Sequence, residues 1–122
     1  MIGGTGQRPR VLLVEDEIMI AMLIEDMLLA IGCEIGATVA RVDDALRAAR
    51  TGAFDLAILD VNLDGKPSYP VADLLKAQGV PFLFATGYGR EGLDPGHATA
   101  PALQKPFAQA DLEAAVARVL AR

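Results

Sequence analysis

Residues 56–60 read Leu-Ala-Ile-Leu-Asp, four apolar side chains in a row that end on an acid. A short, wholly apolar run is typical of a strand that is buried on both faces, as in a parallel sheet. The runs 11–14 and 80–85 have the same character. Longer amphipathic segments separate these runs, so strands and helices alternate along the chain. This alternation predicts an α/β fold.

Five strands and four helices are expected along the chain. The expected strands are 11–14, 33–40, 55–60, 80–85 and 101–105, and the expected helices are 18–31, 43–50, 70–78 and 108–120. Residues 87–99 contain four glycines and little periodicity, and they predict a loop with at most one poor helical turn. Because crossovers between parallel strands are right-handed, we expect a doubly wound, flavodoxin-like five-stranded parallel sheet of order 2-1-3-4-5, with helices on both faces.

Composition narrows the class of protein. With 122 residues, 52% hydrophobic and 22% charged, the chain is expected to fold as one globular domain over 10–122, preceded by a flexible arm over 1–9. The net charge of −5 argues against nucleic-acid binding and against an anionic membrane surface. No apolar run approaches the roughly 18 residues of a membrane span, and no signal peptide is evident. The single cysteine, Cys33, excludes an internal disulfide, so we expect a cytoplasmic protein.

Polar residues collect where the expected strands end. The carboxyl ends of parallel strands share one rim of the sheet, and ligands bind there. The residues predicted at this rim are Glu15, Asp16, Asp60, Asn62, Thr86 and Lys105. Each has an ordinary structural explanation, such as an acid that stabilises a helix N-terminus or a turn. Their coincidence on one rim favours a functional site instead.

The residue types at the rim indicate a particular chemistry. At an effective dielectric near 20, each close pair of carboxylates costs about 3–4 kcal/mol, which a hard divalent cation relieves. Oxygen ligands without His or Cys select Mg²⁺, or Mn²⁺, over Zn²⁺. Lys105 and Thr86 suit phosphoryl oxygens, and Asp60, on the central strand, is best placed to accept a phosphoryl group as an acyl phosphate. Glu15 and Asp16 would then hold the metal.

Four short motifs carry a resemblance to a known family. They are Val-Glu-Asp-Glu at 14–17, Leu-Asp-Val-Asn-Leu at 59–63, Ala-Thr-Gly at 85–87 and Lys-Pro-Phe at 105–107. In this order and spacing, the chain resembles the receiver domain of two-component response regulators over about 10–120. The stretch Phe-Ala-Thr-Gly-Tyr at 84–88 is similar to the signature of a narrower receiver subgroup.

The resemblance implies a role for each rim residue. Asp60 would be the phosphoacceptor, loaded by a histidine kinase or a histidine phosphotransfer protein. The implied Mg²⁺ ligands are Asp16, Asp60 and the backbone carbonyl of Asn62, with Glu15 acting through water. Thr86 and Lys105 would bind the phosphoryl oxygens, and the peptide bond between Lys105 and Pro106 is expected to be cis. Such a protein is a phosphoacceptor that assists its own phosphotransfer and dephosphorylation, rather than an enzyme acting on other substrates.

One position departs from the family pattern. Many receivers carry an aromatic switch residue three positions before the lysine, where this chain has Ala102. The nearest ring is that of Tyr88, between two glycines, which makes Tyr88 our switch candidate. In the helix expected over 18–31, several of Met19, Met22, Leu23 and Met27 must face outward, which suits a partner helix.

The sequence is compatible with other functions. A pseudo-receiver, an interaction module that is never phosphorylated, is the main one, and the intact acids, Thr86 and Lys105 argue against it. A Mg²⁺-dependent phosphatase would need a cap domain. The G-x-G-x-x-G match at 87–92 lacks the helix that a dinucleotide site requires. His97 is predicted to be a solvated loop residue, and Cys33 a small strand residue.

Overall fold

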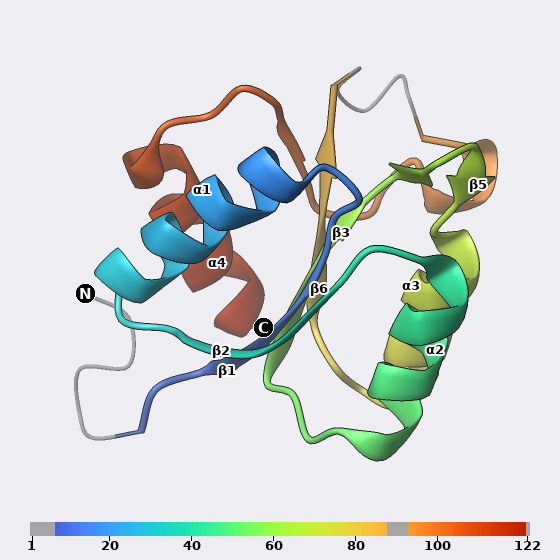
Figure 1. Ribbon diagram of the computed structural model, residues 1–122, viewed down its shortest axis with the longest axis horizontal. Coiled ribbons are helices and arrows are strands. Elements are labelled where there is room, and N and C mark those ends of the chain that lie inside the picture. Colours follow the sequence, from blue (N-terminus) through green and yellow to red (C-terminus); the bar gives the residue numbers. More distant parts are fainter. Residues whose placement is uncertain (1–6, 88–92, 122) are drawn as a thin grey trace.

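The computed structural model describes residues 7–87 and 93–121 (Figure 1). Its elements in chain order are β1 (Arg10–Val14), α1 (Ile18–Ala30), β2 (Glu34–Val39), α2 (Val42–Thr51), β3 (Leu56–Asp60), β4 (Asn62–Leu63), β5 (Lys66–Pro67), α3 (Tyr69–Ala77), β6 (Phe82–Thr86), η2 (Pro95–His97), β7 (Ala102–Gln104) and α4 (Gln109–Leu120).

The main sheet has five strands in the order β2-β1-β3-β6-β7, and every pair is parallel. Counted as strands of this sheet alone, the order is 2-1-3-4-5, which confirms the predicted doubly wound fold. Helices α1 and α4 cover one face of the sheet, and α2 and α3 cover the other (Figure 1). The three central strands are therefore buried on both sides, as their apolar sequences predict.

Each face of the sheet has its own apolar core. Side chains of β1 alternate between the two cores: Val11 and Leu13 pack toward α1 and α4, whereas Leu12 and Val14 pack toward α2 and α3. All four are fully buried. Among the described residues, no helix is long and apolar enough to cross a membrane.

Helix α1 shows how the sequence sets both its face and its end. Ala21, Ile24 and Leu28 are buried at a spacing of three and four residues, so one stripe of the helix meets the sheet. Gly32 has φ 101°, a left-handed conformation that glycine adopts without steric cost. The amide of Cys33 then donates to the carbonyl of Leu28 at 2.9 Å, which closes the helix end. Cys33 is buried, one residue before β2 begins.

A small hairpin after β3 was not predicted. Strands β4 and β5 pair antiparallel, with Asp64 and Gly65 at the turn. Both turn residues have positive φ, 52° and 86°, as a two-residue hairpin requires. The Asp-Gly dipeptide is a strong hairpin signal, so the sequence did contain the information.

Two segments make contacts that the sequence analysis did not predict. Arg8 and Pro9, which lie in the arm expected over 1–9, contact the domain: the Arg8 guanidinium donates to the Leu29 carbonyl at 3.3 Å, and the Pro9 carbonyl accepts from the Glu34 amide at 2.8 Å.

His97 is not the solvated loop residue that the sequence predicted. Its side chain is 16% exposed and lies between two aspartates, because a single 3₁₀ turn, η2, folds it back onto α3.

Two leucines of α1 provide a matched test of this packing. Leu28 is fully buried, whereas Leu23 is 54% exposed on the opposite side of the same helix. We expect Leu28→Ala to lower the free energy of unfolding by about 3 kcal/mol, because it leaves a cavity in the core. Leu23→Ala should change it by less than about 0.5 kcal/mol. Urea unfolding followed by circular dichroism measures both, and equal losses in the two variants would contradict the described face of α1.

Candidate functional site

Three acids meet at the carboxyl rim of the sheet. Glu15 and Asp16 follow β1, and Asp60 is the last residue of the neighbouring strand β3. One carboxylate oxygen from each of the three lies within 4.8 Å of the others. Glu15 is only 3% exposed, and Asp16 and Asp60 are half-buried. The sheet therefore brings together the three acids that the sequence predicted at one rim.

Lys105 supplies the positive charge of this acidic cluster. Its Nζ donates to Glu15 Oε1 at 2.6 Å and lies 3.5 Å from Asp60 Oδ1. The backbone holds it there, because the Lys105 amide donates to the Thr86 carbonyl at 2.8 Å at the end of β6. The peptide bond between Lys105 and Pro106 is cis, as predicted.

The electrostatics of the cluster centre on Asp60. Burial, and then the negative charge of Glu15, raise the pKa of Asp60 from 3.8 to about 7, although Lys105 acts in the opposite direction. Burial lowers the pKa of Lys105, but its hydrogen bond to Glu15 and the charge of Asp60 outweigh burial, so that pKa is raised. At neutral pH the ammonium stays charged, while Asp60 is close to its titration point.

Backbone groups also hold the acids in place. The amide of Asp64, in the hairpin turn, donates to Asp16 Oδ2 at 3.0 Å. The amide of Glu17 donates to Glu15 Oε2 at 3.1 Å. The hairpin thus positions Asp16 from a chain distance of 48 residues, a contribution that the sequence analysis missed.

The other predicted residues have less complete placements. Thr86 ends β6 with its side chain buried, in register with Gln104 of β7 and hence beside the strand that leads to Lys105. Asn62 is exposed at the start of β4, two residues after Asp60. Tyr88, the switch candidate, lies outside the described residues.

The donor set fits a hard divalent cation. All three side chains offer carboxylate oxygens, and among residues 7–87 and 93–121 no His or Cys joins them in the cluster. Mg²⁺ binds such oxygen sets through few protein ligands and keeps several waters. The cluster is also relieved of part of its mutual repulsion when a cation binds.

Comparisons with known proteins agree with this geometry. The family model of the response regulator receiver domain matches residues 11–117. The chain belongs to the response regulator receiver family. This membership confirms the resemblance carried by the four motifs.

Two related proteins are similar to this chain over most of its length. A probable transcriptional regulator, ycf27, of Pyropia yezoensis is 32% identical over 95% of this chain and 49% of its own length. The chain thus spans about half the length of the curated relatives it matches. The solution structure of SdrG from Sphingomonas melonis Fr1 has a TM-score of 0.83 at 42% identity, covering 93% of this chain and 97% of that one.

A third comparison concerns the metal. The receiver domain of the sensor histidine kinase PA1611 from Pseudomonas aeruginosa PAO1 was solved with a magnesium ion coordinated in its active site cleft. Its TM-score is 0.80 at 25% identity, covering 95% of this chain and all of that one (100%).

The raised pKa of Asp60 predicts how stability depends on pH. Because the folded value exceeds the unfolded one, this group favours the fold fully below pH 3.8, and that contribution is lost as pH rises to about 7. In chelator, we expect Asp60→Asn to be more stable than the native protein near pH 8 by on the order of 2–4 kcal/mol. This gain should shrink toward pH 4, as about half of the unfolded carboxyls become protonated.

Urea unfolding at a series of pH values measures this difference. Asp26→Asn, an exposed acid of α1, is the control and should leave the pH profile of the native protein unchanged. A profile of Asp60→Asn parallel to that of the native protein between pH 4 and about 8 would show that Asp60 titrates normally.

Proposed function

We propose that this receiver is a phosphoacceptor switch. In this proposal Asp60 accepts a phosphoryl group from the phosphohistidine of a histidine kinase or a histidine phosphotransfer protein, with Mg²⁺ as the cofactor. The phosphorylated protein then changes its affinity for a protein partner. The observation that carries the proposal is the position of the Asp60 carboxylate, at the end of a buried strand, beside two further acids and 3.5 Å from the Lys105 ammonium.

The transfer step uses groups that the structure brings together. A carboxylate oxygen of Asp60 attacks phosphorus and forms a P–O bond. The P–N bond of the donor breaks, and its electron pair stays on the imidazole nitrogen of the donor histidine. Lys105 already contacts Asp60, and its ammonium would stabilise the negative charge on the phosphoryl oxygens. The hydroxyl of Thr86 would donate a hydrogen bond to the same oxygens. The product is an acyl phosphate on Asp60.

The acids around Asp60 would hold the metal. Glu15, Asp16 and Asp60 would supply the carboxylates. The family resemblance implies the backbone carbonyl of Asn62 as a further ligand. When bound, Mg²⁺ supplies positive charge that lowers the repulsion between an ionised Asp60 and an incoming phosphoryl group. The magnesium ion in the related Pseudomonas aeruginosa receiver supports this assignment, and Mn²⁺ would suit the same oxygen ligands.

An apolar surface beside the acidic cluster suits the phosphodonor. Helix α1 begins directly after Glu17 and exposes five large apolar side chains, which we call the α1 patch: Ile18, Met19, Met22, Leu23 and Leu29. Met19 alone is 83% exposed. Such a patch is typical of a protein-binding surface. A donor helix docked there would bring its phosphohistidine to the rim where Asp60 lies.

The proposal includes two features of the protein as a whole. It is not an enzyme acting on separate substrates, because the group that it transfers ends on its own side chain. It acts in the cytoplasm, where kinases with access to ATP supply phosphohistidine. The alternative, an interaction module that is never phosphorylated, shares the fold but would not need the ionic contacts of Lys105 with Glu15 and Asp60.

The proposed function first predicts covalent labelling of Asp60. With Mg²⁺ and acetyl phosphate, the intact mass should rise by one phosphoryl group, and Asp60→Ala should remove this increase. Excess chelator should also prevent it. Lys105→Met should lower the labelling rate by about tenfold or more, because the ammonium no longer stabilises the transferring group. Intact-mass spectrometry over time measures each rate.

Matched variants make this experiment decisive. Asp26→Asn, on the exposed side of α1, should label like the native protein. Full labelling of Asp60→Ala would reject Asp60 as the acceptor. A native protein that stays unlabelled while folded, both with acetyl phosphate and with a phosphorylated phosphotransfer protein, would favour the non-phosphorylated module.

The second prediction concerns the metal. Because a cation binds the folded cluster and not the unfolded chain, saturating Mg²⁺ should stabilise the protein at neutral pH by about 1–3 kcal/mol. The melting temperature should rise by about 4 °C or more. Differential scanning calorimetry with and without Mg²⁺ measures this shift. In Asp16→Asn most of the shift should disappear, and an unmoved melting temperature in the native protein would exclude a metal site in the cluster.

A further inference from the structure

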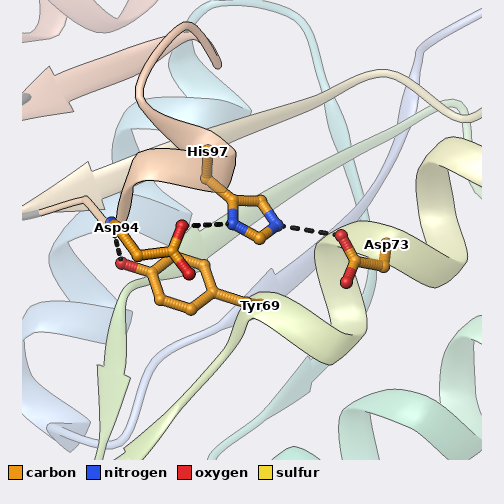
Figure 2. A network of polar contacts seen from close by, with 4 residues as sticks. All are labelled: Tyr69, Asp73, Asp94 and His97. Atoms are coloured by element: carbon orange, nitrogen blue, oxygen red, sulfur yellow. Dashed lines mark hydrogen bonds and ion pairs between the residues drawn. The ribbon is translucent and has the colours of Figure 1, made fainter.

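A second group of charges lies away from the rim, where the chain returns after β6. Figure 2 shows His97 of η2 between Asp94 and Asp73, with Tyr69 beneath its ring. His97 Nδ1 lies 2.6 Å from Asp94 Oδ1, and His97 Nε2 lies 2.8 Å from Asp73 Oδ1. Asp73 belongs to α3, so His97 joins the returning segment to that helix.

The ring contacts reinforce this attachment. The imidazole of His97 stacks on the Tyr69 ring, with centroids 4.3 Å apart and planes inclined by 14°. The amide of Asp94 donates to the Tyr69 hydroxyl at 2.8 Å. Tyr69 also meets Phe84 of β6 edge to face, at 5.8 Å. Residues 93–100 are thus held to α3 by polar contacts, and the ring of His97 is linked to the core through Tyr69 and Phe84.

The geometry indicates which protonation state of His97 is present. A neutral imidazole carries one N–H and donates only one hydrogen bond, whereas an ionised carboxylate can only accept. Since both ring nitrogens of His97 face carboxylates, both contacts are satisfied only by an imidazolium. A cation stacked on an aromatic face is further favoured by the charge distribution of that ring.

Other charged and aromatic groups surround His97. From α3, His97 is faced by Asp73 and Tyr69, and Lys76 lines the same groove. From its own segment it is faced by Asp94, and from β6 by the uncharged ring of Phe84. Among the described residues, two carboxylates contact the imidazole directly, whereas the Lys76 ammonium only lines the same groove, so the surroundings favour the imidazolium.

We propose that His97 is a proton-dependent latch, which fastens residues 93–100 to α3 as an imidazolium shared by Asp73 and Asp94 and releases them when it loses its proton. The latch acts beside a groove of about 450 Å³ between the end of α3, the start of β6 and residues 96–101. His97 and Asp73 form part of its wall, so release reshapes the groove. This inference goes beyond the proposed phosphotransfer and does not depend on it.

The direction of the pH dependence follows from the partners of His97. Burial lowers the pKa of His97, but the hydrogen bonds and charges of Asp94 and Asp73 outweigh burial and raise it above 6.5. Because the folded value is the higher one, the stabilisation is complete below pH 6.5 and is lost as pH rises through the folded pKa. The latch is therefore closed below pH 6.5 and opens as pH rises through the folded pKa of His97.

His97 is the only histidine of the chain, so its titration can be followed directly. We expect NMR of its ring Cε1–H to give a pKa above 6.5. Asp73→Asn and Asp94→Asn should each lower this pKa by about half a unit or more, since each removes one charged acceptor. Asp26→Asn, on the opposite face of the sheet, is the matched control and should leave it unchanged.

Hydrogen exchange then tests whether titration opens the segment. After correction for intrinsic exchange, the protection of the Asp94 and Ala100 amides should fall by about tenfold as pH rises through the His97 pKa. His97→Phe keeps a ring to stack on Tyr69 but cannot titrate, so its protection should be low and independent of pH. Amides of β1 should stay protected in both proteins.

Two outcomes would overturn the latch. One is a His97 pKa at or below 6.5 that neither Asp73→Asn nor Asp94→Asn changes. The other is equal protection of the Asp94 amide on both sides of the titration. Neither outcome bears on labelling of Asp60, so failure of the latch and failure of the phosphotransfer proposal are told apart.

Discussion

The Lys105 ammonium, 2.6 Å from a carboxylate oxygen of Glu15 and 3.5 Å from one of Asp60, is the contact on which this site depends. Glu15 is 3% exposed, and a carboxylate that is so deeply buried is costly without a positive partner. Lys105 lies 90 residues further along the chain. The buried Glu15 carboxylate therefore gains its positive partner only when the residue that follows the last strand of the sheet has docked, which ties the assembly of the site to the completion of the fold.

The parallel sheet explains why such charges can meet at all. Strands β1, β3 and β6 are adjacent and apolar, so their carboxyl ends emerge together from a dry interior. In the register of the sheet, Asp60 pairs with Ala85 and Thr86 pairs with Gln104, which brings these strand ends to one level. The same dryness raises the pKa of Asp60 to about 7. Burial thus separates the carboxylate from water and makes its negative charge costly unless a cation lies nearby.

The sequence predicts features that neighbouring residues encode, and it does not predict contacts between segments that are distant in the chain. Apolar runs such as 56–60 predict strands because their burial is encoded locally, and parallel geometry then places Glu15 and Asp60 at one rim. The hairpin over 62–67 was also encoded, in its Asp-Gly turn, and was overlooked. The partners of His97 were not predictable in this way. Asp73 lies 24 residues away on α3, and only the packing of the segment after β6 brings the two together.

Two cations of this receiver, Lys105 and His97, each lie between two carboxylates, and the difference between them is chemical. The Lys105 ammonium keeps its charge at neutral pH, whereas an imidazolium depends on the pH of the solution. Strand β6 is connected to both: the Thr86 carbonyl accepts from the Lys105 amide, and Phe84 contacts Tyr69, on which His97 stacks. Loss of a proton at His97 would loosen one attachment while the acidic cluster keeps its own. Strand β6 therefore contacts two attachments that answer different signals: the proposed phosphorylation acts at the acidic cluster, and the proposed loss of a proton acts at His97.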